Sequence, residues 1–243
     1  MHQFRSKSSW LDEETNFQGM TVTDHNPLVH IGVLALQGDF QEHVAMLRVA
    51  GAEVSEVRTL SQLSSVDGLV IPGGESTTIA RLLVAFGLME PLRERIESGL
   101  PVWGTCAGAI LLASDVPGLD RPPLGCVAMT IERNAFGTQV DSFETELAIA
   151  GLEEVFHAVF IRAPAIKDVG KGVEVLARLE NDQIVAIRDG SLLATCFHPE
   201  ITEDPRLHEL FISIVRDAVS QGQANKSHLL ESQFVTGRGD NRD

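Results

Sequence analysis

The sequence predicts a single α/β domain in which helices flank both faces of a mainly parallel central sheet. Its apolar runs are short and do not alternate with polar residues, which is typical of strands that are covered on both faces. Segments with apolar residues at helical spacing lie between these runs, and this order favours right-handed crossover connections. In the second half of the chain the strand-like runs lie close together, so we expect a more antiparallel segment at or beside one sheet edge.

In the first half, strands and helices alternate from the first apolar run, Ile31–Leu36. A helix follows, with Phe40, Val44 and Leu47 on one face, and Gly51 ends it. This succession of elements is that of a parallel sheet. The next predicted elements are two strands and then two helices, the first with Phe86 on its apolar face: Val54–Val57, Leu69–Ile71, Ile79–Phe86 and Leu92–Ile96.

The second half begins with short strand-like runs separated by turn residues. A further apolar run, Leu192–Phe197, precedes the last helix, which begins near Pro205. Both ends of the chain are polar and aperiodic, so we expect one domain over residues 29–220 between a disordered extension (1–28) and a disordered tail (221–243). The short runs are Met129–Ile131, Leu147–Ile149, Val155–Ile161, Val173–Leu179 and Ile184–Ile187.

The composition argues against several classes of protein. The formal net charge is −15, from 19 Lys and Arg against 34 Asp and Glu, which disfavours nucleic acid and anionic membranes as partners because both require a basic face. No apolar run approaches the roughly 20 residues of a membrane span, and the N-terminus lacks the apolar core of a secretory signal. The 3 cysteines show neither a disulfide framework nor metal-ligand spacing. We expect a cytoplasmic protein without a metal or cofactor.

A turn of small residues with a cysteine at its apex spans Gly104–Gly108 (Gly-Thr-Cys-Ala-Gly). It follows the apolar segment Leu100–Trp103 and precedes the helix-like run Ile110–Ala113. This is the pattern of a nucleophile elbow with cysteine in place of serine. A buried structural thiol is the alternative, but two glycines inside an ordinary helix would each cost about 1 kcal/mol relative to alanine. We interpret Cys106 as a nucleophile.

A histidine and a carboxylate follow another apolar strand, at His198 and Glu200. Parallel strands end at one edge of a sheet, so we expect both side chains to lie near Cys106. There the imidazole would take the thiol proton and return it to the leaving amine, while the carboxylate would orient the ring. These three residues predict a cysteine-dependent amide hydrolase. We interpret His43, on a helix face, and His157, on a strand, as structural.

The glycine-rich turn Pro72–Ser76 follows a predicted strand and precedes a helix. It is compatible with a plain loop, a phosphate cradle or an oxyanion donor. The phosphate interpretation is weak because the later glycine and lysine of a P-loop are missing. Beside a nucleophile elbow, the backbone N–H groups of Gly74 and Ala107 would form the oxyanion hole. Glu75 and Ser76 would then line the substrate pocket.

Taken together, these motifs resemble those of a known family. A Gly-x-Cys-x-Gly turn followed by His-Pro-Glu is similar to the class I, triad-type glutamine amidotransferases. More narrowly, the sequence resembles the glutaminase subunits of pyridoxal 5′-phosphate synthase, over about Val29 to Val219. The segments that carry this resemblance are Ile31–His43, Val70–Thr78, Gly104–Ala113, Arg133–Glu144, Phe160–Pro164 and Phe197–Glu200.

The resemblance implies that L-glutamine is hydrolysed to glutamate and ammonia through a γ-glutamyl thioester on Cys106. It also implies that the ammonia passes to a separate (β/α)₈-barrel synthase subunit, in a large hetero-oligomer that makes pyridoxal 5′-phosphate. In this family the isolated glutaminase is poorly active until the synthase docks and orders the oxyanion loop. By the same resemblance the glutamine contacts are Gly74, Glu75, Ser76, Arg133, Ile161 and Arg162.

Three other interpretations stay open at the level of the sequence. The chain could be the glutaminase subunit of another class I amidotransferase, such as imidazole glycerol phosphate synthase, although that subunit is not expected to contain the segment Arg133–Glu144. It could be a non-catalytic regulatory subunit on the same fold, which an intact Cys106, His198 and Glu200 disfavours. It could also be a γ-glutamyl peptidase with the same triad and a more open pocket.

Overall fold

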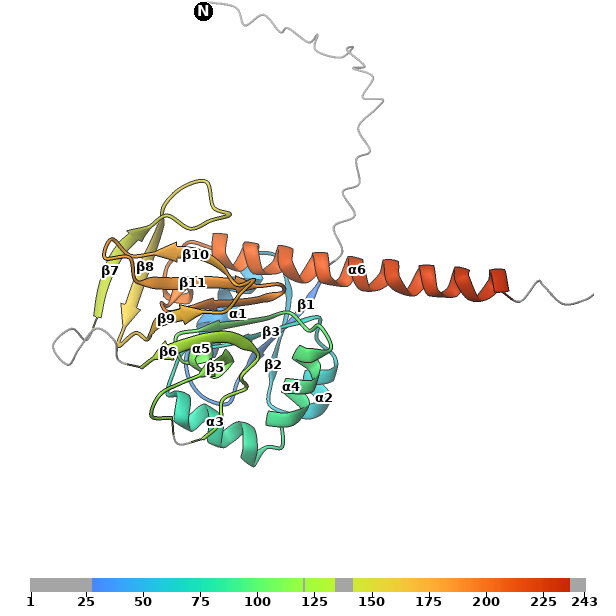
Figure 1. The fold of residues 1–243 in the computed structure, drawn as a ribbon, viewed down its shortest axis with the longest axis horizontal. Helices are drawn as coiled ribbons and strands as arrows, with labels where there is room; N and C mark the ends of the chain where they lie inside the picture. Colours follow the sequence, from blue (N-terminus) through green and yellow to red (C-terminus); the bar gives the residue numbers. More distant parts are fainter. Residues whose placement is uncertain (1–27, 120, 134–141, 237–243) are drawn as a thin grey trace, which may run out of the picture.

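The computed structural model describes residues 28–119, 121–133 and 142–236, with side chains described as far as Gln223 (Figure 1). Ten of the described strands form one main sheet, and a two-stranded sheet of β7 (Ser142–Leu147) and β8 (Phe156–Ile161) lies beside it. The main sheet contains β1 (His30–Leu34), β2 (Glu53–Val57), β3 (Gly68–Ile71), β4 (Val102–Thr105), β5 (Ala113–Asp115), β6 (Val127–Glu132), β9 (Ala165–Val169), β10 (Glu174–Arg178), β11 (Ile184–Asp189) and β12 (Leu192–Thr195).

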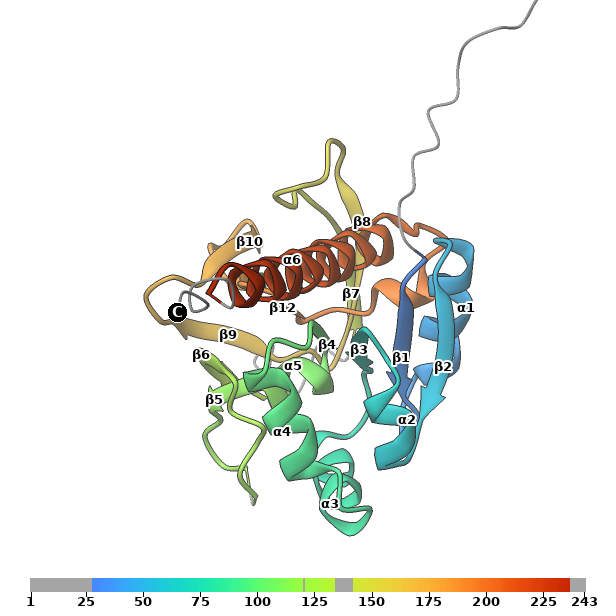
Figure 2. The ribbon, with the colours of Figure 1, turned by 90° about the vertical axis from the view of Figure 1, so that its right-hand side faces the viewer.

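Helices cover both faces of the main sheet. Figures 1 and 2 show α1 and α6 on one face and α3, α4 and α5 on the other. The predicted fold class, a single α/β domain with helices on both faces, is therefore confirmed. The helices are α1 (Phe40–Val49), α2 (Leu60–Ser64), α3 (Ser76–Ala85), α4 (Met89–Glu97), α5 (Ala107–Leu112) and α6 (Arg206–Thr236), with a short 3₁₀ helix, η1 (Pro199–Ile201), before the last of them.

The strand order explains where a site can form. It runs β2-β1-β3-β4-β12-β11-β9-β6-β5, with β10 paired to β11. The five strands β2, β1, β3, β4 and β12 are parallel, so their carboxyl ends lie at the same edge. Beyond β12 the pairs β12–β11, β11–β9 and β9–β6 are antiparallel. The predicted antiparallel segment at one side of the sheet is thus confirmed.

Several details differ from the sequence-based prediction. Phe86 was expected on the apolar face of its helix, but α3 ends at Ala85 and the Phe86 side chain is 58% exposed. A strand was expected at Leu147–Ile149, but β7 covers Ser142–Leu147 and ends where that strand was expected to begin. The polar residues of β7 leave no continuous apolar run in the sequence, so its position was missed. Helix α6 continues to Thr236, beyond residue 221, while the predicted domain boundaries themselves stay a prediction. Residues 1–27 of the predicted extension lie outside the described residues.

Two strands and one α-helix were not predicted at all. Strand β5 has only three residues, and β9 has two exposed polar residues in its centre, Lys167 and Asp168, so neither gives a clear apolar run. Helix α2 did have a local signal. The Thr59 hydroxyl accepts from the Gln62 backbone N–H and the Gln62 side chain accepts from the Thr59 backbone N–H, which is a capping box.

The core between the sheet and the α1–α6 face contains an unusual polar group around Trp103 of β4. The Trp103 indole is fully buried and donates from Nε1 to Thr195 Oγ1 at 3.2 Å. Its ring meets His43 of α1 and His208 of α6 edge-on, with centroid distances of 5.5 and 4.9 Å. Both histidines are fully buried. Two titratable side chains therefore lie inside the core.

The turn between β4 and α5 is packed so closely that it excludes side chains. A Cβ atom on Gly104 would lie 2.5 Å from the Gly108 carbonyl, and a Cβ atom on Gly108 would lie 2.0 Å from the Ile71 carbonyl oxygen. Because these neighbours are backbone atoms, a side-chain rotation cannot relieve either clash. The two glycines thus let α5 approach β3 and β4. Within the described part of the chain, no helix combines the length and the apolar character that a membrane crossing requires.

This packing yields a stability prediction. Gly108→Ala is expected to lower the free energy of unfolding by about 3 kcal/mol or more, because the new methyl group meets backbone that must move. Urea denaturation monitored by circular dichroism measures the change. Gly222→Ala is the matched control, since Gly222 also lies in a helix but has open space around its Cβ position. It should be neutral or stabilising by up to about 1 kcal/mol. Equal stabilities for the two variants would contradict the packing argument.

Candidate active site

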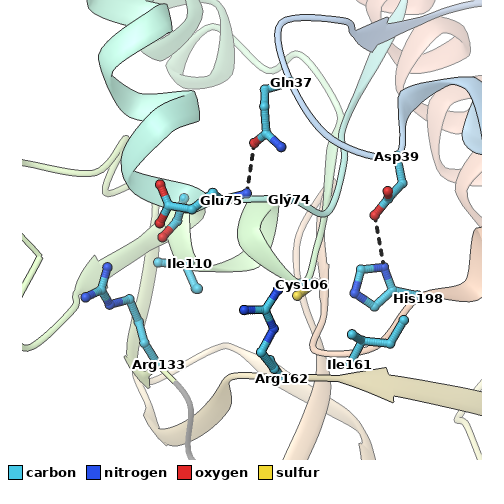
Figure 3. A pocket seen from close by; sticks show the side chains of 11 residues that line it. Gln37, Asp39, Gly74, Glu75, Cys106, Ile110, Arg133, Ile161, Arg162 and His198 are labelled. Carbon is cyan, nitrogen blue, oxygen red and sulfur yellow. Dashed lines mark hydrogen bonds and ion pairs between the residues drawn. The ribbon is translucent and has the colours of Figure 1, made fainter. Parts of the chain in front are cut away.

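A cavity of about 520 Å³ opens at the carboxyl edge of the parallel strands (Figure 3). This volume lies within the range of pockets for small molecules, roughly 300–1,000 Å³. Its walls come from the segments that follow β1, β3, β4, β6, β8 and β12, which are far apart in the sequence. The lining residues are Gln37, Asp39, Gly74, Glu75, Ser76, Cys106, Ile110, Arg133, Ile161, Arg162 and His198.

Cys106 occupies the turn between β4 and α5 in a backbone conformation that is unusual for a residue with a side chain. Its φ is 46° and its ψ is −100°. Such strain costs of the order of 1–3 kcal/mol and persists only where the surroundings impose it. Here the Cys106 N–H donates to the Thr195 carbonyl of β12 at 2.8 Å, and α5 begins at the next residue. The result is a sharp elbow that presents the thiol to the cavity.

His198 links the thiol to a carboxylate. Its side chain is hydrogen-bonded to Cys106, and its Nδ1 lies 2.7 Å from Glu200 Oε1. Its backbone N–H donates to the Val159 carbonyl of β8 at 2.9 Å, so the second sheet also holds it. Burial alone would lower the pKa of the imidazole, but the hydrogen bonds to Cys106 and Glu200 outweigh burial and raise this pKa to about 10. The ring is therefore an imidazolium at neutral pH.

Glu200 lies behind His198, in η1, and its side chain is buried rather than exposed to the cavity. Burial raises the pKa of this carboxyl, and the hydrogen bond with His198 opposes the rise. A second carboxylate lies nearby, since Asp39 Oδ2 is 3.5 Å from His198 Nδ1. The carboxylate of Glu200 is the closer partner, so it is the group that orients the imidazolium.

Asp39, His198 and Glu200 also have the spacing of a possible metal site. Ligand atoms of Asp39, His198 and Glu200 all lie within 4.8 Å of one another. The His198 Nδ1, however, donates its proton to Glu200 Oε1 at 2.7 Å and so has no lone pair for a metal. We interpret the group as a hydrogen-bonded acid–base pair with a neighbouring carboxylate.

The loop after β3 is held in place by the loop after β1. The Glu75 backbone N–H donates to Gln37 Oε1 at 2.8 Å, and the Asp39 N–H donates to the Gly73 carbonyl at 3.2 Å. Gly74 has a φ of 146°, and a Cβ atom there would lie 2.7 Å from Gln37 Oε1. The Gln37 side chain therefore lies directly over this loop, as Figure 3 shows.

The Glu75 side chain also has a structural task. It accepts hydrogen bonds from the backbone N–H groups of Thr77 and Thr78 at 3.2 and 2.6 Å, and so caps α3. Burial by itself would raise the pKa of the Glu75 carboxyl, but the hydrogen bonds from Thr77 and Thr78 together outweigh burial and lower this pKa. The pocket thus contains a carboxylate that stays ionised and is fixed in position. Ser76, the next residue, is buried at the start of α3.

Two arginines face this carboxylate from the other side of the pocket (Figure 3). Arg133 follows β6 and donates from Nη1 to Thr77 Oγ1 at 3.3 Å. Arg162 follows β8 and has a φ of 42°, a second strained position at the cavity, while its neighbour Ile161 is 40% exposed. A pocket with guanidinium groups on one side and a carboxylate on the other suits a small zwitterion such as an amino acid.

The structure brings together nearly all the residues that were selected from the sequence. Every predicted contact residue lines the cavity, together with Cys106 and His198. Glu200 and Ala107 do not line it: Glu200 contacts His198 from behind, and Ala107, 1% exposed, can contribute only its backbone. Of the predicted motif that begins at Arg133, residues 134–141 lie outside the described residues.

Three lining residues were missed, and two of them had a signal. Gln37 and Asp39 directly follow β1, whose carboxyl end meets the same edge as β3 and β4, so the topology alone could have indicated them. Ile110, inside the apolar start of α5, had no such signal. His43 was interpreted as structural, yet its Nε2 lies 3.3 Å from Glu200 Oε2. His157 is exposed and lies between Glu144 and Glu146, away from the cavity.

Comparison with known proteins agrees with this geometry. Residues 33–217 match the SNO glutamine amidotransferase family. A pyridoxal 5′-phosphate synthase subunit PdxT from Mycolicibacterium smegmatis is 58% identical over 188 residues, which are 75% of this chain and 97% of that protein. The PdxT of a Roseiflexus species is 52% identical over 187 residues, 76% of this chain and 99% of that one.

A solved structure agrees with the sequence relatives. The crystal structure of a glutamine amidotransferase superposes with a TM-score of 0.73 at 51% identity, covering 76% of this chain and 98% of the other. The match to the family model extends from the end of β1 into α6 and includes all the other described strands of the sheet and both partners of the Cys106–His198 pair. The chain therefore belongs to the SNO glutamine amidotransferase family.

Proposed function

We propose that the chain is the glutaminase subunit of a pyridoxal 5′-phosphate synthase, which hydrolyses L-glutamine at Cys106 and supplies the ammonia to a partner subunit. The observation that carries this proposal is the hydrogen-bonded series Cys106–His198–Glu200 at the wall of a pocket with opposed guanidinium and carboxylate groups. The PdxT relatives, each covered over nearly its whole length, support the same assignment.

In the first step, Cys106 Sγ attacks the carboxamide carbon of glutamine. The C–N bond breaks, and the imidazolium of His198 transfers its proton to the leaving nitrogen, so that ammonia departs and a γ-glutamyl thioester is left on Cys106. The raised pKa of His198 suits this step, because the ring holds its proton at neutral pH and lies on the thiol. Glu200 keeps the ring in the required orientation.

In the second step, water hydrolyses the thioester. His198, now neutral, takes a proton from the water as its oxygen attacks the acyl carbon, and the C–S bond breaks to release glutamate. The thiolate and the imidazolium are then restored. The two steps together convert glutamine and water into glutamate and ammonia, without a metal or cofactor.

The oxyanion that forms in both steps needs hydrogen-bond donors. We assign this role to the backbone N–H groups of Gly74 and Ala107, each of which would contribute about 2.7–4 kcal/mol to lowering the barrier. Gly74 belongs to the loop that Gln37 covers, and glycine permits a peptide flip there at little cost. Docking of the synthase subunit would supply the energy that orders this loop for catalysis. Glutaminase turnover that is unchanged by the partner would argue against this switch.

The remaining pocket residues would bind the rest of the glutamine molecule. Arg133 and Arg162 are positioned to pair with the α-carboxylate, and the ionised Glu75 to attract the α-ammonium group. Ser76 and Ile161 complete the wall beside them. The ammonia would pass to a (β/α)₈-barrel synthase subunit in a large hetero-oligomer. The 3 free cysteines among the described residues fit the reducing cytoplasm.

Ammonia release from L-glutamine, with and without a (β/α)₈-barrel pyridoxal 5′-phosphate synthase subunit, tests the proposal. We expect release that the partner stimulates and that Cys106→Ala abolishes, because the thioester cannot form without the thiol. Release that needs no partner but is lost in Cys106→Ala would support the thiol-dependent hydrolysis and contradict the assignment of the synthase partner. Absence of release in every mixture would contradict the proposed activity.

The pKa of His198 can be measured directly. In Cys106→Ala the hydrogen bond and the charge of the thiolate are gone, so we expect the pKa of His198 to fall from about 10 toward its ordinary value. The ring of the variant would then lose its proton at a lower pH than that of the native protein. Histidine ring NMR over a pH series checks this shift, and His157, whose pKa is raised by Glu146 and Glu144, serves as the unchanged reference. An identical His198 titration in both proteins would contradict the proposed interaction between Cys106 and His198.

The role of Arg162 in substrate binding gives a kinetic prediction. Arg162→Ala should raise KM for glutamine about tenfold or more with little change in kcat, because a charge-assisted hydrogen bond to the α-carboxylate is made equally in the ground and transition states. The matched control is Arg178→Ala on β10, whose guanidinium pairs with Asp182 and does not line the cavity. A loss confined to kcat would instead place Arg162 in the chemical step.

A further inference from the structure

We propose that His43, held by His208, is a positioning residue that fixes the Glu200 carboxylate from the side opposite His198. This inference rests on the proposed roles of Cys106, His198 and Glu200. It extends the active-site series, through the 3.3 Å contact between His43 Nε2 and Glu200 Oε2, into the core and to α6, by two histidines that were not part of the predicted site.

The contacts form a continuous series. His43 Nε2 lies 3.3 Å from Glu200 Oε2 and 3.1 Å from Thr105 Oγ1. On the other side of the ring, His43 Nδ1 lies 3.0 Å from His208 Nε2. All of these side chains are buried. Glu200 therefore has a histidine at each carboxylate oxygen, His198 at Oε1 and His43 at Oε2.

The positions of the ring hydrogens of His43 and His208 can be inferred from the buried polar atoms that have no hydrogen-bond partner. Among the described residues, His208 Nδ1 and Glu200 Oε2 are buried without a hydrogen bond of good geometry. If His43 Nδ1 carried the proton and donated to His208 Nε2, then His208 Nδ1–H would be a buried donor without an acceptor. In addition, a bare His43 Nε2 would face a carboxylate oxygen.

The opposite arrangement avoids both problems. With His208 protonated on Nε2 and donating to His43 Nδ1, the unpartnered His208 Nδ1 is a bare nitrogen instead of an N–H group. His43 then carries its proton on Nε2, between Thr105 Oγ1 and Glu200 Oε2. The geometry thus points to a neutral His43 whose N–H faces the outer oxygen of the catalytic carboxylate.

Both rings are kept neutral by their surroundings. Burial lowers the pKa of His43 well below its ordinary value, and His208 and His198 add to this effect. Burial also lowers the pKa of His208 to about 3, although Asp204 opposes the change. A neutral donor orients Glu200 without adding a positive charge that would compete with the His198 imidazolium. Asp39, a further charged group near this series besides Asp204, lies 3.5 Å from His198 Nδ1.

The two rings cannot easily rotate away. Trp103 packs edge-on against both of them, with interplanar angles of 76° for His43 and 69° for His208. Thr105, at the end of the same strand, precedes Cys106 directly and contacts the His43 ring. The strand that leads into Cys106 therefore also contacts His43, the residue proposed to position Glu200.

Enzyme kinetics with three variants test the proposal, using the full chain with its synthase subunit and L-glutamine. His43→Leu removes the N–H group that faces Glu200 Oε2 and should lower kcat about tenfold or more with little change in KM, as expected for loss of a polar contact that orients a charged group. His43→Gln keeps an N–H donor and should recover most of the loss. His30→Leu is the matched control, because His30 contacts Ser55 and Ser65 at the start of β1, remote from the site.

Equal activity of native protein and a folded His43→Leu would overturn the inference, as would equal losses in the leucine and glutamine variants. Because a buried histidine is replaced, folding of each variant is checked by near-UV circular dichroism. Should His43→Leu not fold, ¹⁵N NMR of the native rings decides. Protons on Nε2 of both His43 and His208 support the inference, and a proton on His43 Nδ1 overturns it.

Cys106→Ala and Glu200→Gln are measured in the same series, so that failure of the proposed function can be distinguished from failure of the proposed role of His43. Ammonia release that survives Cys106→Ala would overturn the proposed function itself. Loss of release in Cys106→Ala and in Glu200→Gln, beside native activity in His43→Leu, would leave the proposed function intact and overturn only the role of His43.

Discussion

The rest of the site depends on the close contact between the β4–α5 turn and the backbone of β3. The Ile71 carbonyl oxygen lies where a side chain at Gly108 would be, and the Thr195 carbonyl of β12 accepts the Cys106 N–H. These contacts force Cys106 into its left-handed conformation and point the thiol away from the core. The strain is sustained because three neighbouring parallel strands, β3, β4 and β12, hold the turn between them.

From that fixed thiol the acid–base groups follow in sequence toward the core. His198 is bound to the second sheet through Val159, and its ring joins Cys106 to Glu200. The charged members of the series, His198 and Glu200, lie nearer the cavity, while the fully buried members beyond them are neutral imidazoles. This order is the favourable one in a medium of low polarity, since only charges that are paired can be buried without a large cost.

The sequence predicted the parts of this arrangement that local patterns encode. Gly104 and Gly108 around Cys106 indicated the elbow, and His198 with Glu200 after an apolar strand indicated its partners. The position of Gln37 over the Gly74 loop and the contact of His43 with Glu200 depend on pairs of residues far apart in the chain, so no local pattern revealed them. Phe86 illustrates the same limit at small scale, because one residue past the end of α3 is enough to turn an apolar side chain outward.

The place of β12 in the sheet has a consequence for how the molecule is made. This strand is the last to be synthesised, yet it pairs with β4 on one side and β11 on the other, in the middle of the sheet. Until it emerges from the ribosome, the growing chain has two unpaired apolar strand edges and lacks the residues that complete the pocket. Pairing of this central strand joins segments that are distant in the sequence, which is a slow kind of contact to form, and chains that lack it are prone to aggregation.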